Sequence, residues 1–197
     1  GFAHFMEHLT FRGSRHVPDG ESKRIWQRLG VTFGSDSNAQ TTPTATTYAL
    51  DLPQATRQGL NESMKILSGM MVDPNIVDSA VEAERAVVLA EMRESYGPQF
   101  RLSEVTRQHF FAGQPLADHS PIGTVKTLAA ATAARMEAFH QRWYRPENAV
   151  ISVAGDIDPA AAEQLIKDHF DSWQVAGKGA PLPDFGEPAE KAPATRV

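Results

Sequence analysis

The sequence predicts an α+β fold: a mostly antiparallel sheet with helices packed mainly on one face. Two observations lead to this prediction. Several long stretches repeat apolar residues every three or four positions, which is typical of amphipathic helices. Other, shorter stretches are rich in threonine and β-branched residues, as strands are. Helices and strands that do not alternate in βαβ units favour the α+β class.

Composition limits the kinds of protein to consider. The 197 residues are 41% hydrophobic and 22% charged, which is typical of a globular protein. The net charge of −5 and the absence of a basic cluster give no reason to expect nucleic acid. No apolar run reaches the roughly 18 residues that a membrane span requires. The absence of cysteine excludes a disulfide framework and a thiol nucleophile.

The first expected element is a helix over residues 2–11, ended by Gly13. It is apolar on most sides, so we expect it to be buried. His4, Glu7 and His8 interrupt that apolar surface and spell H-x-x-E-H.

Residues four apart in a helix lie on one face, so both histidines can point at one metal ion. The glutamate lies on the same side, where a base beside a metal-bound water belongs. This spelling is the inverted form of the H-E-x-x-H motif of zinc proteases. The alternative is a polar helix start with two surface histidines. A third ligand would decide between the two.

A turn at 18–20 precedes a second helix, expected to be capped by Asp19 or Ser22 and ended by Gly30. Strands are then expected over 31–34 and 44–52. The polar segment 35–41 between these strands has two interpretations. Its composition favours a loop, and the alternative is an exposed strand edge that pairs with an extended peptide.

Two long helices are expected over 54–72 and 75–95. The second carries Glu84 and Glu91, which lie on one face two turns apart. The segment between them is mostly apolar, and burying a carboxylate there costs several kcal/mol unless a positive charge meets it. A zinc ion would supply that charge.

The remaining elements follow the same patterns. They are a helix over 99–111, a loop over 112–123, a helix over 132–144, a compact buried strand over 149–154, and a helix over 158–173. Asp158 is the expected N-cap of the last helix. His109 and His119 have no partner at metal spacing, so we interpret them as surface or packing residues.

From residue 176 onward Gly, Pro, Ala and Lys dominate, as in linkers. We therefore expect a catalytic domain over 1–175 and a linker over 176–197 that leads to a further domain. The chain starts at Gly1, without Met and almost inside a motif. We also expect the natural N-terminus, with any targeting segment, to precede it.

Together, several stretches resemble the pitrilysin/insulinase zinc peptidases, the M16 family, over most of the chain. They are 1–14 around the histidine motif, 37–41, the acidic stretch 84–92, and the segments 143–148 and 153–157. This combination is far more specific than H-x-x-E-H alone. One departure is a gap from His8 to Glu91 that is several residues longer than the resemblance leads us to expect. The region 12–45 is the simplest place for the extra residues.

The resemblance implies one Zn²⁺ per chain, held by His4, His8 and Glu91, with Glu7 as the general base. It makes Glu84 a second acidic residue that supports the site.

The same resemblance assigns substrate contacts. Phe11 matches an aromatic residue that lines the pocket beside the scissile bond. Asn38 and Ala39 match the edge strand whose backbone pairs with substrate.

The implied activity is zinc-dependent endoproteolysis of extended peptides or small proteins, with a second M16-type half on the same chain or another. The wording of residues 16–21 is similar to bacterial members that are two-lobed and often exported, which favours the bacterial periplasm over the cytoplasm. The alternatives are a noncatalytic M16-like partner or structural subunit and a plain metal-binding domain. Noncatalytic members typically lose part of the ligand set, and here the set is complete.

Overall fold

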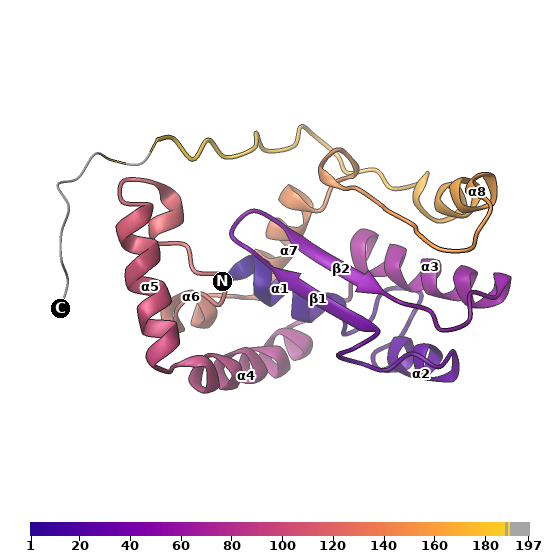
Figure 1. Cartoon of the computed structure of the whole chain (residues 1–197), viewed down its shortest axis with the longest axis horizontal. Coiled ribbons are helices and arrows are strands. Elements are labelled where there is room, and N and C mark those ends of the chain that lie inside the picture. The colour runs from indigo at the N-terminus through magenta and orange to yellow at the C-terminus, as the bar shows by residue number, and fades with distance from the viewer. Residues whose placement is uncertain (188, 190–197) are drawn as a thin grey trace.

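A computed structural model describes residues 1–187 and residue 189. The described chain consists of helices around a single β-hairpin, and the predicted α+β class is confirmed (Figure 1). No helix among these residues is both long and apolar enough to cross a membrane.

Helix α1 (Phe2–Thr10) lies at the centre of the fold. It lies behind the hairpin in Figure 1 and contacts both strands as well as α4, α6 and α7. Phe5, Met6 and Leu9 are fully buried, as expected for a helix that is apolar on most sides. Gly13 follows with a φ of 99°, where a Cβ would lie 2.5 Å from the Val17 carbonyl oxygen, so only glycine fits this stop.

Helix α2 (Glu21–Arg28) has the predicted position but not the predicted cap. Its N-cap is Gly20, and no side chain caps the helix. Asp19 is unavailable because its carboxylate accepts a hydrogen bond from Arg12 (2.9 Å).

The hairpin corrects the strand predictions. Its strands are β1 (Ser37–Thr41) and β2 (Thr46–Leu50), which pair antiparallel with Ser37 opposite Leu50 and Thr41 opposite Thr46. The second strand was predicted. The first lies in the segment 35–41, where composition favoured a loop, and it agrees with the alternative of a strand edge and with the edge strand that the family resemblance implied. The expected strand at 31–34 is instead a turn.

That turn has a clear cause. Val31 is buried against α2 and α3, Gly34 has a positive φ, and the Asp36 carboxylate accepts a hydrogen bond from the Thr32 N–H (2.7 Å). These contacts reverse the chain immediately before β1, so the β-branched residues of the segment 31–34 lie in a turn and not in a strand.

The remaining helices largely follow the predicted ranges. They are α3 (Arg57–Val72), α4 (Asp78–Ser95), α5 (Pro98–Phe110), α6 (Val125–Ala129), α7 (Ala133–Trp143) and α8 (Pro159–Phe170), with short 3₁₀ turns at Pro115–Ala117 and Pro146–Asn148. Asp158 caps α8 as expected, accepting from the Ala160 N–H. Helix α6 was not predicted, although Thr124 and Thr127 form a capping box at its start.

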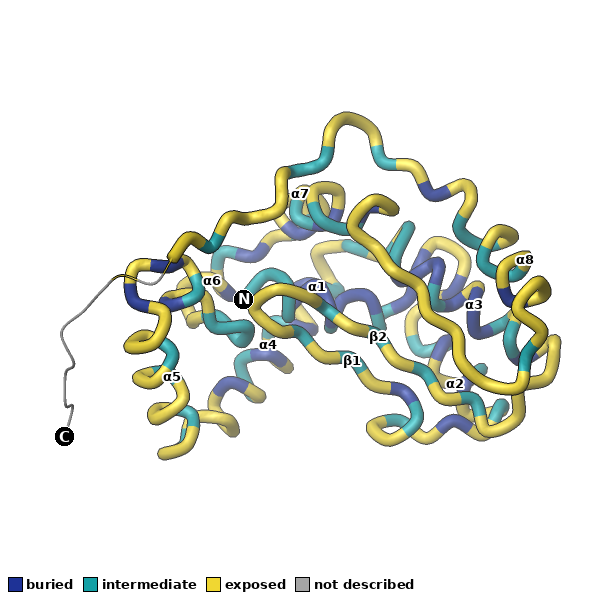
Figure 2. Tube along the Cα trace, turned by 45° about the horizontal axis from the view of Figure 1, so that its top comes forward, coloured by how far each residue is buried: buried dark blue, intermediate teal, exposed yellow. Residues whose placement is uncertain are grey.

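Two hydrophobic clusters hold these elements together, and the buried segments in Figure 2 trace them. One joins α1 to α4, α6 and α7 through residues such as Phe5, Val88 and Met136. The other surrounds Trp26 and Ile66 and joins α2, α3 and the inner face of the hairpin. The first cluster fixes α1 against α4, and this sets the distance between the histidine motif and the acidic helix.

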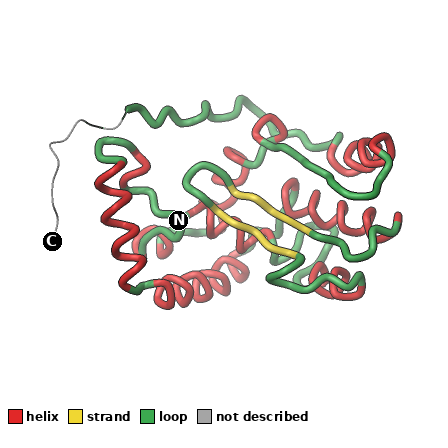
Figure 3. Tube along the Cα trace, in the orientation of Figure 1, coloured by secondary structure: helices red, strands yellow, loops and turns green. Residues whose placement is uncertain are grey.

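The strand predicted over 149–154 is absent. Figure 3 shows a loop between α7 and α8, and Val150 is 95% exposed. Within the described residues the sheet contains only β1 and β2, so the backbone of this segment pairs with no strand, and its residues are exposed.

Beyond α8 the chain is extended and crosses the molecule towards α5 (Figures 1 and 2). Buried Arg145 anchors its start by donating to the carbonyl oxygens of Val175, Ala176 and Gly177. The expected linker at 176–197 has no regular secondary structure through residue 187. Residues 188 and 190–197 of it lie outside the described part.

Candidate metal centre

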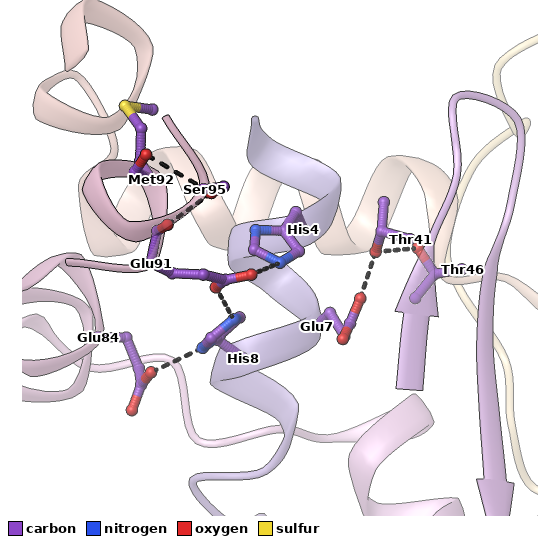
Figure 4. Close-up of polar contacts among 9 residues, drawn as sticks. All are labelled: His4, Glu7, His8, Thr41, Thr46, Glu84, Glu91, Met92 and Ser95. Atoms are coloured by element: carbon purple, nitrogen blue, oxygen red, sulfur yellow. Dashed lines mark hydrogen bonds and ion pairs between the residues drawn. The ribbon is translucent and has the colours of Figure 1, made fainter. Parts of the chain in front are cut away.

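Two histidines from α1 and one glutamate from α4 converge (Figure 4). His4 Nε2 lies 3.5 Å from Glu91 Oε1, and His8 Nε2 lies 3.3 Å from Glu91 Oε2. One ligand atom from each residue lies within 4.8 Å of the others. Within the described ranges, no other group of three such side chains is close enough to share an ion.

These distances fit zinc. With zinc–ligand bonds of about 2.0–2.1 Å, two ligand atoms of a tetrahedral site lie roughly 3.3–3.5 Å apart. Both histidine-to-glutamate distances agree with that spacing but involve different oxygens of Glu91, and one ligand atom from each of the three residues lies within 4.8 Å of the others. Three protein ligands leave a fourth position for water, which is the pattern of catalytic sites. The donor set therefore suits zinc, and the ligand roles of the three residues stay a prediction.

Glu84 fixes the orientation of one imidazole. His8 Nδ1 lies 3.1 Å from Glu84 Oε2, and an ionised carboxylate can only accept in that hydrogen bond. The proton of a neutral His8 ring is therefore on Nδ1. The lone pair of Nε2 is then directed at the Glu91 side, where a metal would lie.

The sequence predicted that Glu84 and Glu91 are buried and that zinc compensates for their charge. The surroundings of the two side chains differ from that prediction. The Glu84 side chain is only 11% exposed, but Arg12 Nε lies 2.6 Å from its Oε1 and supplies the positive charge. The Glu91 side chain is 46% exposed, so its charge remains largely solvated. Burial alone therefore does not require a metal at either residue.

The surroundings of the two histidines shift their pKa values in opposite directions. Burial lowers the pKa of His4 below its ordinary value, and the nearby Glu91 charge only partly opposes this. Burial acts the same way on His8, but the Glu84 hydrogen bond and the neighbouring carboxylates outweigh it and raise the His8 pKa. Burial would raise the pKa of Glu84, but the His8 hydrogen bond and Arg12 lower it.

Glu7 faces the hairpin. Its residue is 8% exposed, and its carboxylate accepts a hydrogen bond from Thr41 Oγ1 at 2.5 Å (Figure 4). Glu7 thus lies between the histidine face of α1 and strand β1, next to the cluster that could hold a metal.

Strand β1 turns one backbone edge towards this site. Thr42 N donates to Ala45 O and Asp51 N donates to Asp36 O, so the even-numbered residues pair with β2. The backbone groups of Ala39 and Thr41 therefore point to the free edge. The Ala39 N–H is already bonded to Asn38 Oδ1 (2.9 Å), and a peptide that adds at this edge must displace that side chain.

Phe11 is the residue that directly follows α1. It packs on the cluster around Trp26, with its ring centroid 6.1 Å from that of Tyr48. Among the described residues, His109 and His119 are in no group of three histidine, aspartate or glutamate side chains close enough to share an ion.

Sequence reasoning missed two residues of the site. Arg12 lies one turn beyond His8, so its i, i+4 spacing was the available signal. Nothing in the sequence around Thr41 indicated a contact with Glu7.

Comparison with known proteins decides the family. A family model described as insulinase (peptidase family M16) matches residues 1–119. The chain belongs to the M16 family. A second M16 model, described as the peptidase M16 inactive domain, matches residues 130–197.

Several M16 relatives are described as zinc proteases. The chain is 36% identical over 170 residues to the probable zinc protease PqqL of Escherichia coli, covering 86% of the chain and 18% of that protein. It is 30% identical over 203 residues to the zinc protease PqqE of Helicobacter pylori, covering 100% of the chain and 43% of that protein. This membership supports a peptidase. The chain spans less than half the length of either relative.

The fold matches a solved M16 structure. The first half of the periplasmic protease PqqL from Escherichia coli superposes with a TM-score of 0.89 at 34% identity. The match covers 96% of this chain and 40% of that one. The chain therefore has the fold of an M16 half-domain.

Proposed function

We propose that this protein is a zinc-dependent endopeptidase that hydrolyses extended peptides or small proteins. The observation that carries the proposal is the convergence of His4, His8 and Glu91 beside Glu7 and the free edge of β1. Ligands, a base and a peptide-binding edge lie together, as metal-assisted hydrolysis requires.

Each residue has a defined task in this proposal. Zinc held by the two histidines and Glu91 would lower the pKa of a water and polarise the peptide carbonyl. Glu7 takes a proton from the attacking water and returns it to the leaving amine nitrogen. Glu84 holds the His8 ring in its ligating tautomer.

Substrate binds extended in this proposal. The Ala39 and Thr41 backbone groups form ladder hydrogen bonds with a peptide, which give affinity irrespective of its sequence. Asn38 releases the Ala39 N–H as the peptide docks. Phe11 lines the wall beside the scissile bond.

The second half and the cellular compartment are also proposals. A second M16-type half, on the same chain or another, closes over the site, as suggested by a relative described as half of a protease. That same relative is described as periplasmic, which favours the bacterial periplasm.

Glu7→Gln tests the base. In protein expressed from the complete gene, we expect cleavage of an unstructured peptide to fall by at least about 100-fold, because Gln cannot take a proton. Zinc content, measured by atomic absorption, should stay at one per chain. The matched control is Glu94→Gln, at an exposed position of α4, which should cleave normally.

The two measurements separate the rival functions. A noncatalytic subunit would not cleave even as wild type, and a plain metal-binding domain would hold zinc without cleavage. Normal cleavage by Glu7→Gln would show that the base assignment is wrong. Removal of zinc by a chelator should abolish wild-type cleavage, and added zinc should restore it.

A further inference from the structure

We infer that Thr41 is a positioning residue that holds the Glu7 carboxylate in place relative to a peptide on β1. The inference rests on the proposed function and deepens it by naming a link between peptide docking and the base. Within the described residues, Thr41 is the only side chain recorded as hydrogen-bonded to that carboxylate.

The contact is short and shielded. Thr41 Oγ1 donates to Glu7 Oε2 at 2.5 Å, across 34 positions of the chain, and Glu7 is buried. A hydrogen bond from a hydroxyl to an ionised group is stronger than one between neutral groups. A buried carboxylate with one such donor is held in one rotamer, which a base needs.

A second hydroxyl fixes the direction of the first. Thr41 Oγ1 also lies 3.1 Å from Thr46 Oγ1, directly across the hairpin. A hydroxyl has only one proton, and Thr41 commits that proton to Glu7. With that proton committed, Thr46 is the donor to Thr41, and Figure 4 shows the two contacts in sequence from Thr46 through Thr41 to Glu7.

Further hydroxyls lie beside this pair. Tyr144 and Tyr48 share a hydrogen bond of 2.7 Å. Burial raises the pKa of Tyr144 to about 12, so its phenol stays neutral at any physiological pH. The Tyr144 hydroxyl group therefore places no charge beside the Glu7 carboxylate that would compete with Thr41 for it.

Strand geometry gives Thr41 its second contact. Its side chain faces α1, while its backbone N–H and C=O point to the free edge of β1. One residue therefore touches the base through its hydroxyl and a docked peptide through its backbone. The position of the carboxylate is set by the same strand that sets the register of the peptide.

The test compares Thr41→Val with Thr41→Ser in protein expressed from the complete gene. Valine keeps the branched shape but has no hydroxyl, whereas serine keeps the hydroxyl. We expect Thr41→Val to lower kcat at least about 10-fold with KM changed by less than about twofold, since misplaced groups slow chemistry. Thr41→Ser should retain most of the wild-type kcat, and zinc content should be one per chain in both.

The matched control is Thr44→Val, at an exposed position of the hairpin turn whose side chain makes no recorded hydrogen bond. It should have wild-type kcat and KM. A crystal structure of each variant without metal gives a readout independent of activity. The Glu7 carboxylate should leave its position in Thr41→Val and keep it in Thr41→Ser.

The outcomes are distinct. If wild type cleaves peptides but Thr41→Val keeps its kcat, or Thr41→Ser loses as much as Thr41→Val, the inference is wrong and the proposed function stands. An increase in KM alone would also overturn the inference, because it would give Thr41 a role in binding only. If wild type cleaves no extended peptide, the proposed function fails and the inference fails with it.

Discussion

The two glutamates of α4 have different partners, and these partners decide what each residue is free to do. Glu84 is paired with Arg12 and hydrogen-bonded to His8, so both of its oxygens are engaged. Glu91 faces the two imidazoles, and no lysine or arginine of the described chain pairs with it. Of the two, Glu91 is therefore the one available to bind a metal directly.

Replacing Glu91 with Gln should lower zinc affinity at least about 100-fold, because a neutral amide replaces a charged ligand and even indirect supports contribute 10–100-fold. Titration against a chromophoric chelator measures this. Glu94→Gln, at an exposed position on the same helix that belongs to no group of possible metal ligands in the described chain, should bind zinc as wild type does. Equal affinity of the Glu91 variant and wild type would remove Glu91 from the site.

Single residues of the site differ in how far the sequence predicts them. His4, Glu7 and His8 lie on one helical turn, so their geometry follows from local spacing alone. Glu91 is on another helix. Its apolar context indicated a zinc ion near Glu84 or Glu91, and the family resemblance singled out Glu91 as the ligand. The Thr41 contact depends on how the hairpin packs against α1, which no local pattern encodes.

At the scale of elements, helices were predictable because their periodic apolar faces are buried in the two clusters. Strands were not. Residues 31–34 have β-forming residues but turn a corner, and 37–41 have small polar residues but form a strand. Pairing with β2 and packing against α1 override intrinsic preference there. The segment 149–154 shows the reverse case, where a strand-like sequence has no partner.

Helix α7 carries a buried titratable group. His140 Nε2 donates to the Met71 carbonyl (2.8 Å), and its ring stacks on Tyr144. Burial lowers the pKa of His140 below its ordinary value of 6.5, and the Met71 hydrogen bond only partly opposes this. The folded state therefore binds a proton less readily than the unfolded state.

This difference predicts a pH-dependent stability. The contribution of neutral His140 is fully present above pH 6.5 and is lost as pH falls below it, because the unfolded state then binds more protons. Thermal unfolding at about pH 7.5 and about pH 5.5, with chelator present to exclude zinc release, measures the loss. His140→Gln keeps a donor for Met71 but cannot titrate, and it should lose less stability on acidification. An equal loss in both proteins would show that other groups cause it.

At the scale of the whole molecule, α1 contacts the two other elements of the site, α4 and the hairpin. Its histidine face meets α4 on one side, and Glu7 meets the hairpin on the other. The first hydrophobic cluster fixes one contact, and the second supports the hairpin. Under the proposed function this chain supplies one side of the site, with the metal ligands, the base and the peptide-binding edge, and the Glu91 side chain is about half exposed to solvent.

A site that is open to solvent excludes little water. We therefore expect the isolated 197-residue chain to bind zinc. We expect it to cleave peptides at least about 100-fold more slowly than protein expressed from the complete gene. The reason is that positioning and water exclusion need a second surface opposite β1, the proposed second M16-type half. Matched zinc content and circular dichroism spectra control for folding of the isolated chain. Equal turnover by the two proteins at equal zinc content would show that the isolated chain is a complete enzyme and that no second half is needed.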